Sequence, residues 1–149
     1  MKKDLKNMIV DILLVDDSLE DAELAIRILK KNHLANNLLH LEDGEEALNY
    51  LFSNPSDYNK LPKVVLLDLK MPKVDGLEVL KKIKSDEILR SLPVVVMTSS
   101  KEEKDIVESY RLGVNAYIVK PVDLEKFIKA ITDIGFFWLV LNEVPRNVG

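Results

Sequence analysis

Short runs of apolar residues, separated by longer amphipathic stretches, constrain the fold of this chain more than any other feature. Strands that are apolar throughout are typical of a parallel sheet buried on both faces by helices. In the stretches between them, apolar residues recur at helical spacing, for example at Ala22, Ala25 and Leu29. The predicted strands span residues 9–15, 38–41, 64–67, 93–97 and 116–119, and the predicted helices about 19–31, 44–52, 77–83, 101–112 and 123–141.

The alternation of strands and helices determines how the elements connect. Consecutive strands joined through a helix run parallel, and their crossovers are right-handed. The sequence therefore predicts an α/β fold, a five-stranded parallel sheet of order 2-1-3-4-5 with helices on both faces, which is the flavodoxin-like doubly wound arrangement. The chain has 149 residues, close to the size of one domain. We expect a single domain over residues 1–149 with its core at about 8–141.

Composition argues against several classes of function. Lys and Arg number 21 and Asp and Glu 25, and this mild acidity argues against nucleic-acid and anionic-membrane partners. Cysteine is absent, which excludes thiolate zinc sites and cysteine nucleophiles. No apolar run approaches the ~20 residues that a membrane span needs. The N-terminal residues lack a signal-peptide pattern, so we expect a cytoplasmic protein.

Polar residues follow most of the predicted strands at the point where each strand ends. Asp16 and Asp17 follow the first strand, and Asp68 follows the third. Thr98 and Lys120 end the fourth and fifth strands. The carboxyl ends of parallel strands share one edge of the sheet, where open α/β sheets bind ligands. Strands one and three are neighbours in the predicted order, so Asp17 and Asp68 should face the same small volume.

Three carboxylates at one edge would repel one another, and a divalent cation removes this conflict. Ligands that are all oxygen suit Mg²⁺, and the absence of a nearby His or Cys argues against zinc. Lys120 offers a positive charge and Thr98 a hydroxyl donor for phosphoryl oxygens. These residue types together predict a phosphoryl-transfer site with a nucleophilic carboxylate and Mg²⁺ as cofactor.

The residues at the strand ends resemble the motifs of the response-regulator receiver family, in its single-domain, chemotaxis-regulator-like form. The resemblance runs from about Met8 to the end of the last predicted helix. Its pieces are Val15-Asp16-Asp17, Leu67-Asp68-Leu69-Lys70-Met71-Pro72 continuing to Asp75-Gly76, Thr98-Ser99-Ser100, and Lys120-Pro121.

The resemblance implies a role in two-component signal transduction and not in turnover of an external substrate. Asp68 would accept a phosphoryl group from a sensor histidine kinase or a histidine phosphotransfer protein. Mg²⁺ would be bound directly by Asp17, Asp68 and the backbone carbonyl of Lys70, and by Asp16 through water. The Lys120–Pro121 peptide bond would be cis.

The same resemblance implies that Thr98 and Tyr117 are switch residues. Thr98 would move toward the phosphoryl oxygens and leave room for the ring of Tyr117 to turn inward. The face formed by the fourth helix, the fifth strand and the fifth helix would then change shape. The side chain of Lys70 could screen the phosphoryl group from water or contact it directly, and the sequence leaves both roles open.

The last predicted helix is apolar nearly all round at its C-terminal end. Such a surface is typical of an interface, so we expect homodimerisation or partner docking there, with burial beneath residues 142–149 as the alternative. This aromatic helix end and the long loop before the third strand resemble the regulators paired with bacterial phytochrome kinases. The predicted interface residues are Phe136, Phe137, Leu139 and Val140.

Other functions are compatible with parts of the pattern. A Mg²⁺-dependent phosphohydrolase with an aspartyl-phosphate intermediate shares the chemistry, but enzymes of the haloacid-dehalogenase type carry Asp-x-Asp after the first strand. A nucleotide- or flavin-binding module would need a phosphate-cradling loop where this chain has the acidic residues 16–21. A phosphorylation-independent interaction module is a further alternative. Within the receiver interpretation, final output and relay intermediate are both open.

Single residues also have simpler interpretations. Acids such as Asp16 and Asp17 are favoured at any helix N-terminus. Thr98 could cap the fourth helix, as could Ser99 or Ser100. The two histidines of the chain, at positions 33 and 40, belong to no recognisable motif, and we expect both at the surface.

Overall fold

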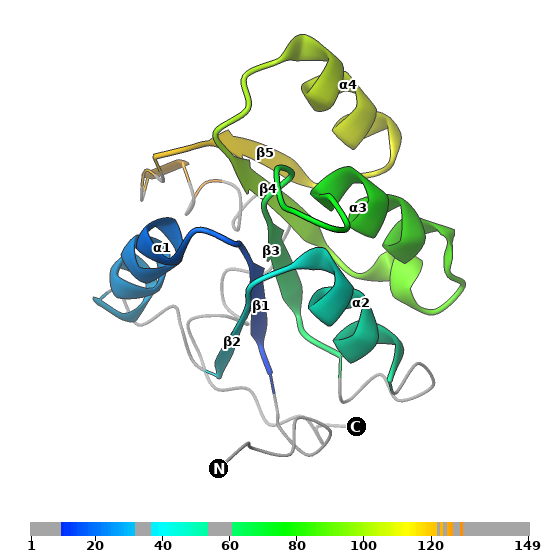
Figure 1. Cartoon of the computed structure of the whole chain (residues 1–149), viewed down its shortest axis with the longest axis horizontal. Helices are drawn as coiled ribbons and strands as arrows, with labels where there is room; N and C mark the ends of the chain where they lie inside the picture. The colour runs from blue at the N-terminus through cyan, green and yellow to red at the C-terminus, as the bar shows by residue number, and fades with distance from the viewer. Residues whose placement is uncertain are drawn as a thin grey trace.

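A parallel five-stranded sheet lies at the centre of the molecule in the computed structural model, which describes residues 10–31, 37–53, 61–121, 123, 125, 126 and 129 (Figure 1). The strand order is β2-β1-β3-β4-β5, which confirms the predicted topology. The strands are β1 (Ile12–Val15), β2 (Leu38–Leu41), β3 (Val64–Leu67), β4 (Val94–Thr98) and β5 (Ala116–Val119).

Helices cover both faces of this sheet, as Figure 1 shows with α1 on one side and α2 and α3 on the other. Helix α4 packs against α3 and β5. None of the helices within the described ranges is long and apolar enough to cross a membrane. The helices are α1 (Leu19–Lys31), α2 (Gly44–Phe52), α3 (Gly76–Ser85) and α4 (Glu103–Arg111), with a short 3₁₀ helix, η3, at Leu89–Ser91.

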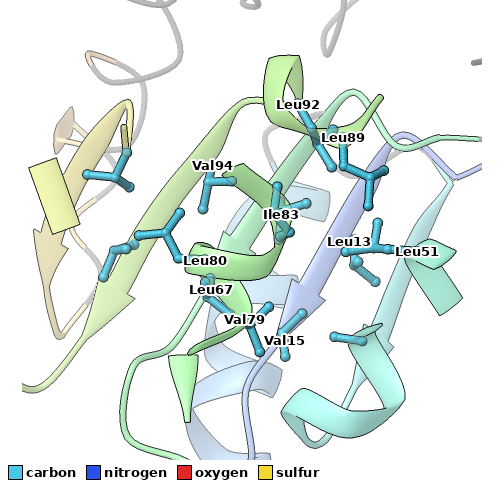
Figure 2. Packing of buried hydrophobic residues seen from close by; sticks show 14 of the residues in the cluster. Leu13, Val15, Leu51, Leu67, Val79, Leu80, Ile83, Leu89, Leu92 and Val94 are labelled. Atoms are coloured by element: carbon cyan, nitrogen blue, oxygen red, sulfur yellow. The ribbon is translucent and has the colours of Figure 1, made fainter. Parts of the chain in front are cut away.

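The apolar strand residues divide between two core layers because successive side chains of a strand point to opposite faces. Ile12 and Leu14 of β1 pack in the layer beneath α1, with Ala25. Leu13 and Val15 belong to the layer on the other face, beneath α2 and α3. Figure 2 shows this second layer, in which Leu51, Val79, Leu80 and Ile83 of the helices meet the strand residues.

Helices α2 and α3 begin at aspartate caps. Asp43 accepts the backbone N–H of Glu46 at 2.8 Å, and Asp75 accepts that of Glu78 at 3.0 Å. Both caps have the Asp-x-x-Glu spacing of a capping box, which satisfies N–H groups that have no partner inside the helix. Just after the C-terminal end of α4, Gly113 adopts φ +102°, the left-handed conformation in which glycine commonly ends a helix.

The last predicted helix falls mostly outside the described residues. At its start, Asp123 Oδ1 accepts the backbone N–H groups of Glu125 at 2.8 Å and Lys126 at 3.4 Å, as expected for a cap. The predicted interface residues Phe136, Phe137, Leu139 and Val140 lie outside the described part of the chain.

Candidate functional site

The pairing of β1 with its neighbours places the acidic residues side by side. Asp16 and Asp17 follow β1 directly, and Asp68 follows β3, its partner in the sheet. The Asp68 N–H donates to the Val15 carbonyl at 2.9 Å, and the Asp16 N–H donates to Leu41 at 3.1 Å. The sheet hydrogen bonding therefore continues one residue past the strands and holds the backbone of both acids.

These three aspartates form an acidic cluster at the carboxyl edge of the sheet. One carboxylate oxygen from each of Asp16, Asp17 and Asp68 lies within 4.8 Å of the other two. Asp16 and Asp68 are buried, and Asp17 is exposed to solvent. Carboxylate oxygens in such a group are suitable ligands for a hard divalent cation.

Lys120 reaches into the acidic cluster from the end of β5. Its ammonium lies 2.6 Å from Asp16 Oδ2, 3.3 Å from Asp68 Oδ2 and 3.0 Å from Asp21 Oδ2. The Lys120 side chain is 9% exposed. Its backbone N–H donates to the Thr98 carbonyl at 2.8 Å, and the Lys120–Pro121 bond is cis, as the family resemblance implied.

The electrostatics of the cluster follow from burial and from these contacts. Burial raises the pKa of Asp16, against the hydrogen bonds from Lys120 and the Ser18 N–H, which lower it. Burial alone would lower the pKa of Lys120, but its hydrogen bonds with Asp16 and Asp21 raise the pKa above the ordinary value. Lys120 therefore carries its charge, yet it can neutralise only one of the surrounding carboxylates.

Two residues near the cluster were not predicted. Asp21 lies in the first turn of α1 and binds Lys120, a contact that no sequence spacing revealed. His40 is partly exposed, and its Nε2 lies 2.8 Å from the Asp16 carbonyl, a contact that the sequence did not predict. A carbonyl only accepts, so Nε2 carries the proton and donates. The other histidine lies outside the described residues.

Lys70 contributes to the site through its backbone and turns its side chain elsewhere. Its N–H donates to Asp68 Oδ1 at 3.3 Å, so the residue lies directly beside this carboxylate. Its ammonium lies 3.2 Å from Asp105 Oδ2, at the start of α4. The structure thus adds a third role for this side chain to the two that the sequence left open.

Thr98 and Tyr117 both contact Ser100, in the loop between β4 and α4. Thr98 is fully buried, and its Oγ1 accepts the Ser100 N–H at 3.3 Å. It does not cap α4, whose capping position is Glu102. The Tyr117 hydroxyl donates to the Ser100 carbonyl at 3.0 Å.

Comparison with known proteins agrees with this geometry. Residues 12–132 match the family model of the response regulator receiver domain. The chain belongs to the response regulator receiver family. Receiver domains are signalling modules of two-component systems, so the resemblance seen in the motifs is confirmed at the level of the family.

Similar receivers include regulators of phytochrome systems. The solved bacteriophytochrome response regulator AtBRR is 54% identical, with a TM-score of 0.76, over 91% of this chain and 99% of AtBRR. Response regulator Rcp1 from Synechocystis sp. is 40% identical over 136 residues, which cover 90% of this chain and 92% of Rcp1. The solved Mn²⁺-bound form of Rcp1 is 38% identical, with a TM-score of 0.70, over 91% of this chain and 99% of that one.

Proposed function

We propose that this receiver accepts a phosphoryl group from a histidine kinase onto Asp68, with Mg²⁺ bound, and thereby changes its surface around α4 and β5. The observation that carries the proposal is the cluster itself. Three carboxylates from two neighbouring strands lie together, and Lys120 from β5 binds two of them. A metal-binding acidic cluster with a fixed lysine is suited to phosphoryl transfer, because both stabilise charge on phosphoryl oxygens.

In the proposed reaction, a carboxylate oxygen of Asp68 attacks the phosphorus of a phosphohistidine. A P–O bond forms to Asp68, and the P–N bond breaks with its electron pair remaining on the imidazole nitrogen. Lys120 stabilises negative charge on the transferring oxygens from its position 3.3 Å from Asp68. The hydroxyl of Thr98 is the second donor.

The donor set of the cluster fits Mg²⁺. Asp17, Asp68 and the backbone carbonyl of Lys70 would hold the ion directly, and Asp16 would act through water. These are oxygen ligands, and the exposed Asp17 leaves the cluster open to solvent, which suits an ion that retains several waters. When bound, the ion neutralises the excess negative charge of the carboxylates and of the incoming phosphoryl group.

The proposed switch starts from the contacts of Ser100. Thr98 would exchange its contact with the Ser100 N–H for the phosphoryl oxygens, and Tyr117 would leave the Ser100 carbonyl and turn inward. The surface formed by α4, β5 and the final helix would then change. A Tyr117→Ala variant whose partner binding still responds fully to phosphorylation would exclude this relay.

Partner, domain composition and location belong to the same proposal. The similarity to AtBRR supports a bacteriophytochrome-type histidine kinase as phosphodonor, with a histidine phosphotransfer protein as the alternative. We propose that the 149 residues act as one cytoplasmic receiver domain.

Homodimerisation or partner docking through the final predicted helix stays a prediction. The receiver-family match favours signalling over the phosphohydrolase alternative.

The direct test is phosphotransfer from a phosphorylated bacteriophytochrome-type kinase domain, with and without Mg²⁺. We expect label to move from the kinase histidine to the wild-type receiver but not to Asp68→Asn. The matched control is Asp75→Asn, because Asn caps a helix as well as Asp does and Asp75 is exposed. Transfer to Asp68→Asn at the wild-type rate would refute the assignment of the acceptor. Turnover of a generic phosphatase substrate would favour the phosphohydrolase.

A further inference from the structure

The side chain of Lys70 links the β3–α3 loop to the first turn of α4. Its ammonium lies 3.2 Å from Asp105 Oδ2. Asp105 is 3% exposed, whereas the Lys70 side chain is 55% exposed. A buried carboxylate is tolerated in its charged form when it has hydrogen bonds and a counter-charge. Lys70 supplies this counter-charge, and the contact raises the pKa of Lys70.

Asp105 also holds Ser100, in the loop that precedes α4. The Ser100 hydroxyl donates to Asp105 Oδ2 at 2.6 Å and accepts the N–H of Glu102 at 3.3 Å. The hydroxyl of Ser100 and the ammonium of Lys70 together lower the pKa of Asp105. Asp105 is therefore charged at neutral pH, and its position in α4 is tied to both the loop and Lys70.

Ser100 in turn contacts both predicted switch residues. Its N–H donates to Thr98 Oγ1 at 3.3 Å, and its carbonyl accepts the hydroxyl of Tyr117 at 3.0 Å. A continuous series of polar contacts thus joins Lys70, two residues after the proposed acceptor, to the residues that are proposed to move. A change at Lys70 has a direct physical route to the β4–α4 loop.

We propose that Asp105, with Lys70 as its counter-charge, is a positioning residue that holds the β4–α4 loop in its unphosphorylated arrangement through Ser100, and that a phosphoryl group on Asp68 competes with Asp105 for the Lys70 ammonium. This inference rests on the proposed function. The Lys70 N–H already donates to Asp68 Oδ1 at 3.3 Å, so the lysine starts beside the acceptor. Its half-exposed side chain has room in solvent to turn.

The competition follows from charge. A phosphoryl group carries about −1.5 to −2 charges, more than the carboxylate that it modifies. When Lys70 turns toward it, Asp105 remains buried without its counter-charge, and the arrangement of Ser100 around it is no longer favoured. A contact that exists only in the unphosphorylated form stabilises that form, so it opposes the switch until phosphorylation removes it.

The test measures hydrogen exchange at the backbone amides of Ser100 and Glu102 by NMR, in proteins that have not been phosphorylated. The variants are Lys70→Met, Asp105→Asn and the double variant, each of which removes the ion pair. The matched control is Lys104→Met, which removes an exposed ion pair between Lys104 of α4 and Glu102, the residue at its capping position. Amides of β3 report whether each variant keeps the fold.

We expect exchange at Ser100 and Glu102 to be about fivefold faster than in the wild type in both single variants. The double variant should exchange no faster than either single variant, because the same ion pair is lost in each case. The control should stay within about twofold of the wild type. Unchanged exchange in Lys70→Met, or effects that multiply in the double variant, would overturn the role of Asp105.

A second arm phosphorylates the wild type with acetyl phosphate, in which an Asp68 oxygen forms the new P–O bond and acetate leaves with the electron pair. The expected result is exchange at Glu102 as fast as in unphosphorylated Lys70→Met. Ser100 is not used in this arm, because the proposed switch itself releases its N–H from Thr98. A phosphorylated wild type with unchanged exchange would overturn the competition alone. A wild type that takes up no phosphoryl group would overturn both the proposed function and the competition. In that case the unphosphorylated variants of the first arm still decide whether Asp105 holds the loop.

Discussion

Lys120 is the residue on which the charge balance of the acidic cluster depends. It lies within 3.3 Å of Asp16 and Asp68, and it is the only one of the site residues with a positive charge directed at them. The sequence predicted its position at the edge of the sheet but not its contact with Asp21. Removing this lysine should therefore slow phosphoryl transfer, because its charge is the one directed at Asp16 and Asp68.

We expect Lys120→Met to slow phosphoryl uptake by about 100-fold, since removal of one preorganised charge stabiliser has effects of this order. Mg²⁺ affinity should not fall, because the carboxylates lose a competing cation. Uptake is followed by intact mass and Mg²⁺ binding by calorimetry. Lys63→Met is the control, because Lys63 pairs with Asp11 at 3.4 Å, before the strands begin. Uptake by Lys120→Met within twofold of wild type would contradict the proposed role.

His40 fixes the backbone of Asp16 from the neighbouring strand. The Asp16 peptide is held at both ends by β2, since its N–H donates to Leu41 and its carbonyl accepts from His40 at 2.8 Å. We expect His40→Leu to weaken Mg²⁺ binding by about tenfold, as outer contacts of metal ligands typically do. His40→Gln, which retains an N–H donor, should restore most of the affinity in calorimetry. Equal affinities in both variants would refute this role of the hydrogen bond.

At the level of the elements, the start of α3 lies directly against the Asp68 loop. The Gly76 N–H donates to the Leu69 carbonyl at 2.8 Å. A Cβ at Gly76 would clash with the Asp68 carbonyl oxygen and would lie 2.5 Å from Leu69 Cα. Both atoms belong to the backbone and cannot rotate away, so any side chain here must displace the loop that carries the proposed acceptor.

Gly76→Ala should therefore lower the free energy of unfolding by about 3 kcal/mol, the upper end of the effect of overpacking. Chemical denaturation of the metal-free protein measures this change. Gly113→Ala is the comparison, because an added Cβ there would make only ordinary contacts with the Lys84 side chain, at 3.7 Å or more, and only the positive φ is unfavourable. It should cost about 1 kcal/mol. A loss at Gly76 no larger than that at Gly113 would show that the loop adapts easily.

The elements also show where periodicity is informative. The bounds of α1 and α2 agree with those predicted from the apolar pattern, because the same spacing determines which face of each helix is buried. Helix α4 begins at Glu103, later than the predicted 101, because the hydroxyl of Ser100 binds Asp105 and the N–H of Glu102. The 3₁₀ helix η3 was not predicted, because it depends on Asp86 accepting the N–H groups of Ile88 and Leu89. Local side-chain bonds of this kind leave no periodic signal.

For the whole molecule, the order of elements was enough to predict the sheet and the edge at which the acids gather. Parallel strands bring their carboxyl ends together whatever the side chains are, so Asp16, Asp17, Asp68 and Lys120 could be placed at one edge. The contacts of Lys70 with Asp105 and of His40 with Asp16 could not, because they depend on the reach and rotamers of single side chains. The sequence thus predicted where these residues gather, and the structure reveals what holds them there.

The central claim is that Asp68 takes up one phosphoryl group in a reaction that needs Mg²⁺. The most direct measurement is the intact mass of wild type and Asp68→Asn after incubation with acetyl phosphate, with Mg²⁺ and with a chelator. We predict one base-labile phosphoryl adduct on the wild type, formed only with Mg²⁺ and absent from Asp68→Asn. An adduct that persists in Asp68→Asn, or a wild type that gains none while remaining folded, would contradict the claim.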